Sequence, residues 1–195
     1  MSLLDDFVSA CEKNKVKYAV VGAWALIQIT RYRTTRDVDF AVLKRDMLKL
    51  KEALEEIGYF YIYNPRLGKH EFKHSERGDI DVYTETIGGA SVENLVKRAL
   101  TIAFENRKLR CVTPEDLILV KLASGRERDL TDVSVVLYNL VEKLDWEYLN
   151  EEAKKLGIRL RDGLLKSVER LPITVVNPPK VKKQLTRKIN DLCNS

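Results

Sequence analysis

Two aspartates, Asp37 and Asp39, stand two residues apart in an apolar stretch of this 195-residue chain. Alternate residues of a β-strand face the same side, so a strand here would place both carboxylates on one face and turn Val38 and Phe40 to the other. Two adjacent negative charges repel each other unless a cation joins them. Mg²⁺ prefers hard oxygen ligands and is often shared between one or two carboxylates and substrate phosphates. The pattern therefore predicts a strand whose carboxylates bind a metal ion together with a nucleotide.

A further pair of carboxylates, Asp79 and Asp81, follows in a second predicted strand over residues 79–84. These two aspartates are also two residues apart, so they would share one face of that strand. Spacing alone leaves open which of them belongs to the metal site.

A glycine turn lies before the first aspartate pair. Residues 17–21 are apolar after Lys17 and end in two β-branched valines, so they predict a strand that runs directly into Gly22. Residues 23–30 contain good helix formers and no helix breaker, so they predict a helix. The expected order is strand, glycine turn and helix.

The rest of the chain predicts both strands and helices. Thr113 and Pro114 give a strong signal for the start of a helix, and the apolar residues that follow predict that this helix is buried. From residue 126 onward only amphipathic helices are expected, so we place a domain boundary near Gly125, with domains over residues 1–125 and 126–195. The further expected strands are residues 36–43, 59–63, 70–74 and 108–112, and the further expected helices are residues 91–100, 126–143, 145–156 and 158–170.

The composition restricts the kind of protein. With 45% apolar residues the chain can bury a proper core, and its formal net charge is +5. Most of this charge lies in a basic tail, residues 180–195, which holds five Lys or Arg residues against one Asp. The tail weakly favours an RNA or an acidic protein as a partner. The three distant cysteines and the lack of a signal peptide or a long apolar run lead us to expect a soluble cytoplasmic protein without membrane association.

Taken together, these motifs resemble a known family. The strand, Gly22 and helix, the segment Arg33-Thr34-Thr35-Arg36-Asp37-Val38-Asp39 and the later Ile80-Asp81-Val82 resemble the DNA polymerase β-like nucleotidyltransferase superfamily. Among its members the chain looks most like the small prokaryotic ones, which include antitoxin-type minimal nucleotidyltransferases and aminoglycoside nucleotidyltransferases. The resemblance covers roughly residues 16–135 and implies an α+β fold, with a small mixed sheet flanked by helices and followed by a helical C-terminal region.

The resemblance also implies a two-metal site. Asp37 and Asp39 would hold two Mg²⁺ (or Mn²⁺) ions, and Asp81 would complete one of the two sites as the third catalytic carboxylate. We prefer Asp81 to Asp79 because Asp81 lies between Ile80 and Val82, as the resemblance requires. The nucleoside triphosphate donor, ATP by expectation, would approach the backbone at Gly22 and the amides of the next helix. The candidates for contacts to its phosphates are Arg33, Arg36 and Lys121.

The turn departs from the family pattern at one position. The family usually has Gly-Gly or Gly-Ser, whereas this chain has Gly22-Ala23, so the serine hydroxyl that contacts phosphate is absent. Two functions therefore stay open. The first is transfer of a nucleoside monophosphate, AMP by expectation, to a hydroxyl group of a protein, an RNA or a small molecule. The second is a catalytically inactive module that binds nucleotides or a toxin-like protein partner.

Overall fold

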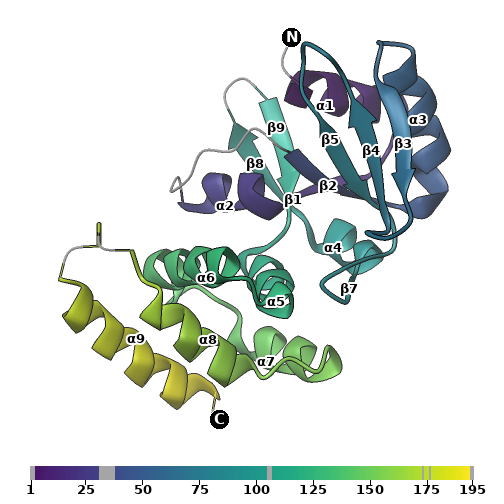
Figure 1. The fold of residues 1–195 in the computed structure, drawn as a ribbon. Helices are drawn as coiled ribbons and strands as arrows, with labels where there is room; N and C mark the ends of the chain where they lie inside the picture. Colours follow the sequence, from purple (N-terminus) through teal and green to yellow (C-terminus); the bar gives the residue numbers. More distant parts are fainter. Residues whose placement is uncertain (1–2, 31–37, 105–106, 173, 176, 194–195) are drawn as a thin grey trace. The chain divides into compact units, whose positions relative to one another are not determined.

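Three short strands lie at the centre of one sheet, and two of them carry the described residues of the predicted metal site. In this computed structural model, which describes residues 3–30, 38–104, 107–172, 174–175 and 177–193, these strands are β1 (Tyr18–Val21), β2 (Val38–Val42) and β5 (Ile80–Tyr83). Strand β1 is antiparallel to β2, and β2 is parallel to β5. The sheet is therefore mixed, as expected, and its strand order is β3-β4-β5-β2-β1-β9-β8 (Figure 1).

The outer strands extend this sheet on both sides. On one side the hairpin β3 (Phe60–Asn64) and β4 (Lys69–Lys73) pairs with β5 in antiparallel fashion. On the other side β9 (Arg107–Cys111) is parallel to β1, and β8 (Leu100–Phe104) is antiparallel to β9. Two further short strands, β6 (Thr86–Ile87) and β7 (Ala90–Ser91), form a separate ribbon.

One face of the sheet is buried beneath helices. Phe40 of β2 and Ile80 and Val82 of β5 are fully buried. They join a core that includes residues of α1 and α3, and Phe7 of α1 stacks on Phe40. Helix α4 contacts β1 and β2 and precedes β8. The helices and the single 3₁₀ turn of this part of the described chain are α1 (Leu3–Lys13), α2 (Gly22–Thr30), η1 (Lys44–Asp46), α3 (Met47–Glu55) and α4 (Val92–Arg98).

The second half of the chain forms helices with a core of their own. Helix α8 packs against α6 and α9, and α9 buries Leu185 and Ile189. The expected buried helix is α5, which begins at Pro114 and is buried over most of its length. These helices are α5 (Pro114–Ser124), α6 (Glu127–Leu140), α7 (Trp146–Lys155), α8 (Leu160–Glu169) and α9 (Pro178–Cys193). None of the helices in the described ranges is long and apolar enough to cross a lipid bilayer.

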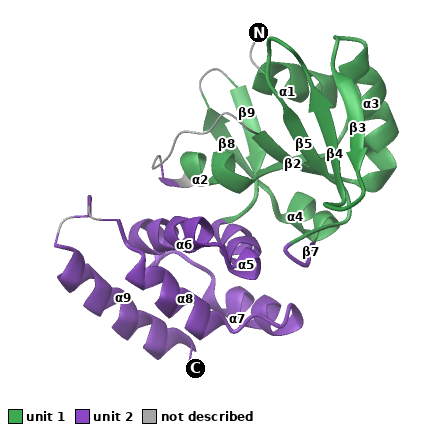
Figure 2. Cartoon of the chain, viewed as in Figure 1, with its two compact units in different colours: residues 1–28, 33–87, 91–113 green, residues 29–32, 88–90, 114–195 purple. Residues whose placement is uncertain are grey.

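The contacts divide the chain into two units, which Figure 2 colours separately. The first unit comprises residues 1–28, 33–87 and 91–113, and the second comprises residues 29–32, 88–90 and 114–195. Helix α5 thus belongs to the helical unit, whereas the sequence analysis grouped it with the first domain by placing a boundary near Gly125. The division into domains over residues 1–125 and 126–195 stays a prediction.

Strand β8 was not expected. It occupies residues 100–104, directly after α4, where the sequence analysis extended a helix to residue 100 and assigned nothing beyond it. The strand lies at the edge of the sheet, and Leu100 is 51% exposed. Ile102 and Phe104 nevertheless pack against the core and alternate with the exposed Thr101 and Ala103, so a period-two signal was present in the sequence and was not used.

Candidate active site

A row of carboxylates crosses three neighbouring strands of the sheet. Asp39 of β2 is in register with Asp81 of β5, and Asp81 is in register with Glu71 of β4. Residues in register on adjacent strands place their side chains on the same face, and the strands are about 4.8 Å apart. Asp39, Asp81 and Glu71 therefore lie side by side on one face of the sheet.

Strand alternation fixes this row on the face away from the core of α1 and α3. Asp39 lies between Val38 and Phe40, which are 2% and 0% exposed, respectively. Asp81 lies between the fully buried Ile80 and Val82. Because neighbouring residues of a strand point to opposite faces, burial of these apolar side chains turns both carboxylates to the other side. The predicted orientation of Asp39 is thus confirmed.

Gly22 lies directly against Asp39. Its φ is +62°, a left-handed conformation that favours glycine. A Cβ atom at this position would overlap the Oδ2 atom of Asp39 and would lie 3.1 Å from its Cγ atom and 3.3 Å from its Cβ atom. The close approach is possible because β1 and β2 pair Val21 with Asp39. Glycine is therefore required here both by the backbone conformation and by the nearby carboxylate.

Helix α2 begins at this glycine, so its first turn starts beside Asp39. The first backbone N–H groups of a helix have no partner within the helix, and the helix dipole attracts negative charge to this end. Ala23 is the second residue of α2 and has no hydroxyl group. Anion binding at this position would consequently depend on backbone amides.

Lys69 of β4 joins two carboxylates of the row. Its Nζ atom lies 2.6 Å from Oδ2 of Asp81 and 3.1 Å from Oε1 of Glu71. Desolvation lowers the pKa of Lys69, but hydrogen bonds to Asp81 and Glu71 outweigh this effect and raise it. The hydrogen bond from Lys69 is also the largest cause that lowers the pKa of Glu71. Lys69 therefore remains an ammonium ion that partly neutralises the row.

Sequence reasoning missed Lys69 and Glu71. Both lie in the strand expected at residues 70–74 or directly before it, and no motif marked them. The available signal was the alternation Lys69-x-Glu71-x-Lys73, which places three charged side chains on one strand face. Sequence alone does not show that this face adjoins Asp81.

The two candidates for the third carboxylate differ in position. Asp81 lies within β5, in register with Asp39, whereas Asp79 precedes the strand. The Oδ2 atom of Asp79 lies 2.8 Å from Nζ of Lys73, and its side chain is 46% exposed. Asp81 and not Asp79 is the strand neighbour of Asp39. The remaining predicted site residues Asp37, Arg33 and Arg36 lie outside the described residues.

Lys121 lies in α5, within the helical unit, and is only 5% exposed. Its Nζ atom is 3.0 Å from Oδ1 of Asp129 and 2.5 Å from Oδ2 of Asp132, both in α6. Burial raises the pKa of Asp132, and the positive charge of Lys121 only partly opposes this effect. The ammonium group thus connects α5 and α6, and its expected contact with phosphate stays a prediction.

The carboxylates fit a divalent metal by their chemistry. In the described part of the chain, no three or more His, Cys, Asp or Glu side chains form a group that could hold a metal ion. Mg²⁺ does not need such a group, because it commonly binds one or two carboxylates and takes its other ligands from phosphates and water. Asp39 and Asp81, side by side and turned away from the core, supply a donor set of this kind.

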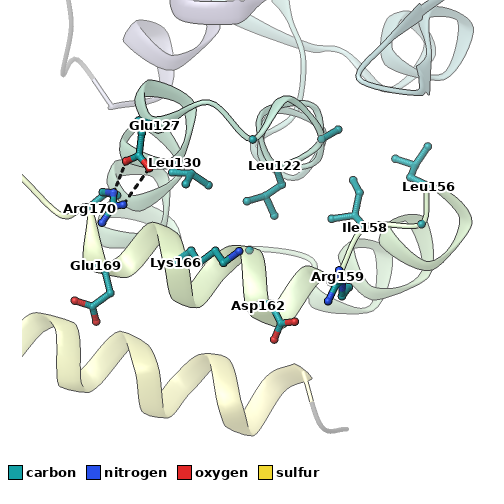
Figure 3. A pocket seen from close by; sticks show the side chains of 14 residues that line it. Leu122, Glu127, Leu130, Leu156, Ile158, Arg159, Asp162, Lys166, Glu169 and Arg170 are labelled. Carbon is teal, nitrogen blue, oxygen red and sulfur yellow. Dashed lines mark hydrogen bonds and ion pairs between the residues drawn. The ribbon is translucent and has the colours of Figure 1, made fainter.

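The helical unit contains a hollow of about 800 Å³ (Figure 3). One side is apolar and includes Leu122, Leu130 and Ile158, and α8 contributes charged side chains. The lining contains three acidic and three basic residues. One pair, Glu127 and Arg170, forms an ion pair with an Nη2 to Oε1 distance of 3.0 Å. The charges in this hollow are balanced, so it shows no preference for an anion or a cation. The acidic lining residues are Glu127, Asp162 and Glu169, and the basic ones are Arg159, Lys166 and Arg170.

Comparison with known protein families also indicates a nucleotidyltransferase. Residues 2–158 match the model of a protein family described as "nucleotidyltransferase of unknown function (DUF6036)". No curated protein sequence matches the chain.

Structural comparison matches the chain to two solved structures, and the first of them shares its fold. The lincosamide antibiotic adenylyltransferase LnuA, determined with lincomycin bound, shares 24% sequence identity over 68% of this chain and 93% of its own, with a TM-score of 0.53. The antibiotic-resistance factor ANT(2'')-Ia shares 12% identity over 98% of this chain and 88% of its own, with a TM-score of 0.49.

Proposed function

We propose that this chain, which belongs to the DUF6036 family of nucleotidyltransferases and is an enzyme of the polymerase β-like type, transfers AMP from ATP to a hydroxyl group of an acceptor. The observation that carries this proposal is the contact between Gly22 and Asp39, with Asp81 in register beside Asp39. This arrangement puts two carboxylates next to the start of a helix, where phosphate can bind.

Asp39 and Asp81, with Asp37, would hold Mg²⁺ or Mn²⁺. Bound divalent ions supply charge neutralisation for the triphosphate and favour ionisation of the attacking hydroxyl group. The amides at the start of α2 bind the triphosphate, and Gly22 leaves room for its approach. The acceptor oxygen forms a bond to the α-phosphorus while the bond from this phosphorus to the bridging oxygen breaks. Pyrophosphate leaves, and Asp81 accepts the proton of the hydroxyl group.

Ala23 changes one contact in this scheme. A serine hydroxyl at this position would donate a hydrogen bond to phosphate, and alanine cannot. The backbone N–H groups of α2 remain available, and Arg33 and Arg36 are proposed to supply positive charge at the phosphates. We therefore expect weaker triphosphate binding than with serine, and retained chemistry.

For the acceptor we propose a hydroxyl-bearing small molecule. The support is the fold shared with LnuA, an adenylyltransferase whose structure contains an antibiotic. The alternative is a protein or an RNA acceptor, which the basic residues 180–195 favour. A toxin-like protein partner stays a prediction from the sequence resemblance.

Label transfer from α-³²P-ATP tests the proposed reaction. The native protein is incubated with Mn²⁺ or Mg²⁺ and a panel of hydroxyl-bearing small molecules, RNAs and proteins, and labelled products are separated. We expect transfer that requires the divalent ion and is abolished in Asp81→Asn. Asp79→Asn is the matched control, and it should retain transfer because Asp79 precedes β5 and pairs with Lys73. Full activity of Asp81→Asn would refute the role of this carboxylate.

A further inference from the structure

Another hollow lies in the sheet unit, at the end of β1 and β2 that is remote from the carboxylate row. Its volume is about 420 Å³. Lys17 directly precedes β1, and Leu43 directly follows β2. Asp39 and Leu43 are four residues apart along one strand direction, which corresponds to about 13 Å. This hollow is therefore separate from the proposed active site.

The lining of this hollow carries an excess of positive charge. Four of the lining side chains are cationic and one, Glu93, is acidic. In the described part of the chain, the structure records no hydrogen bond or ion pair for the side chains of Lys17, Arg45 or Lys97. By contrast, the neighbouring Lys44 pairs with Glu85 at 2.6 Å. The cationic residues are Lys17, Arg45, Lys97 and Arg110.

Arg110 contributes to the hollow a guanidinium group that one hydrogen bond holds in place and that keeps one N–H group without a partner. Its Nη2 atom donates a hydrogen bond of 2.8 Å to the carbonyl oxygen of Val96, at the end of α4. Its Nε atom is buried and has no hydrogen-bond partner. A buried N–H group without an acceptor is unfavourable, and a guanidinium group suits the oxygens of phosphate. Arg110 lines the hollow, so a phosphate group bound there would offer oxygen acceptors to its guanidinium group.

We infer that this hollow binds the phosphate groups of a small phosphorylated metabolite. Cations gathered without counterions repel one another, and a polyanion removes this repulsion. The volume lies in the range of small-molecule sites, and Leu43 and Val96 add an apolar surface. No aromatic side chain lines the hollow, so it lacks the stacking platform that single-stranded nucleic acids use. The site does not depend on the proposed transfer reaction.

Calorimetric titration of the full chain with inorganic pyrophosphate, in the presence of EDTA, tests this inference. We expect saturable binding that weakens by about tenfold or more in the double variant Arg45→Gln/Lys97→Gln, because each lost cation removes a charge-assisted hydrogen bond. Both side chains are exposed, so the double variant should fold. The matched control is Lys13→Gln/Lys108→Gln, which removes the same charge from exposed positions outside the hollow and should leave the affinity within about twofold.

Three outcomes would overturn the inference. The first is the absence of saturable pyrophosphate binding. The second is binding that Arg45→Gln/Lys97→Gln leaves unchanged. The third is binding that is lost in Asp39→Asn, which would place pyrophosphate at the proposed active site. If pyrophosphate does not bind but a single-stranded RNA does, and the double variant loses RNA binding, the surface serves nucleic acid and the inference is wrong.

Discussion

At the scale of single residues, the contact between Gly22 and Asp39 links the fold to the proposed chemistry. Gly22→Ala should strain the backbone and displace the Asp39 carboxylate. Gly68→Ala is the matched control, because Gly68 has a φ of +60° and no atom within 4 Å of an added Cβ. We expect each substitution to lower the free energy of unfolding by at least about 1 kcal/mol through backbone strain. Only Gly22→Ala should weaken the metal-dependent binding of an ATP analogue, by about tenfold or more.

Thermal unfolding and calorimetric binding of the two variants check this prediction. Equal nucleotide affinity in Gly22→Ala and Gly68→Ala would show that the position of the Asp39 carboxylate does not matter for binding.

Lys69 is the second residue with a specific expected effect. Its ammonium group occupies one oxygen of Asp81, so it competes with a divalent ion for that carboxylate. Replacement by methionine removes the positive charge and keeps the aliphatic length. We expect Lys69→Met to tighten Mn²⁺ binding in the absence of nucleotide by about threefold to tenfold, as measured by electron paramagnetic resonance.

Lys73→Met serves as the comparison for Lys69→Met, because Lys73 pairs with Glu71 and Asp79 and not with Asp81. It should change Mn²⁺ affinity less. Weaker Mn²⁺ binding in Lys69→Met would mean that the ammonium group orients Asp81 for the metal and does not compete with it.

At the scale of elements, the pair α5 and α6 depends on a buried ammonium group. Lys121→Met would leave Asp129 and Asp132 without their shared cation, although Arg126 and Ser124 still contact Asp129. Removing one partner of a buried ion pair commonly costs about 3 to 5 kcal/mol of unfolding free energy. Chemical denaturation measures this loss.

Arg170→Gln is the control for the loss expected in Lys121→Met. It breaks the ion pair with Glu127, in which both side chains are exposed to solvent, so its effect should be much smaller. Equal stability of Lys121→Met and the native chain would contradict a structural role for Lys121 and would favour its predicted contact with phosphate.

The elements that position the site were largely predictable from the sequence. The apolar residues around Asp39 and Asp81 marked β2 and β5 as strands, and these apolar residues are buried in the structure. The register that places Asp39 beside Asp81 was not predictable, since it depends on the pairing of segments about forty residues apart. For the same reason the ion pair between Lys69 and Asp81 was missed. Resemblance to a family, and not periodicity, led from Asp81 to a proposed role.

At the scale of the whole molecule, the two units differ in the functional features that they contain. The sheet unit contains Gly22, Asp39 and Asp81, and the helical unit has its own buried core and a hollow with balanced charge. The basic tail is part of this core, because α9 buries Leu185 and Ile189. Some of its lysines pair with acidic side chains of the same unit; Lys188, for example, lies 2.6 Å from Glu142. The net charge of residues 180–195, counted from the sequence, does not show that the tail packs in this way. This count therefore overestimates the positive charge that the tail offers to a partner.

The most direct measurement is calorimetric binding of a non-hydrolysable ATP analogue, with and without Mg²⁺ or Mn²⁺, to the native chain and to Asp39→Asn. Asparagine keeps the shape of aspartate and removes the charge, so the fold should persist. We expect binding to the native chain that requires the divalent ion and is at least about tenfold weaker in the variant, with little change in Tm. Binding that needs no divalent ion, or that Asp39→Asn retains in full, would contradict the proposed metal-dependent site.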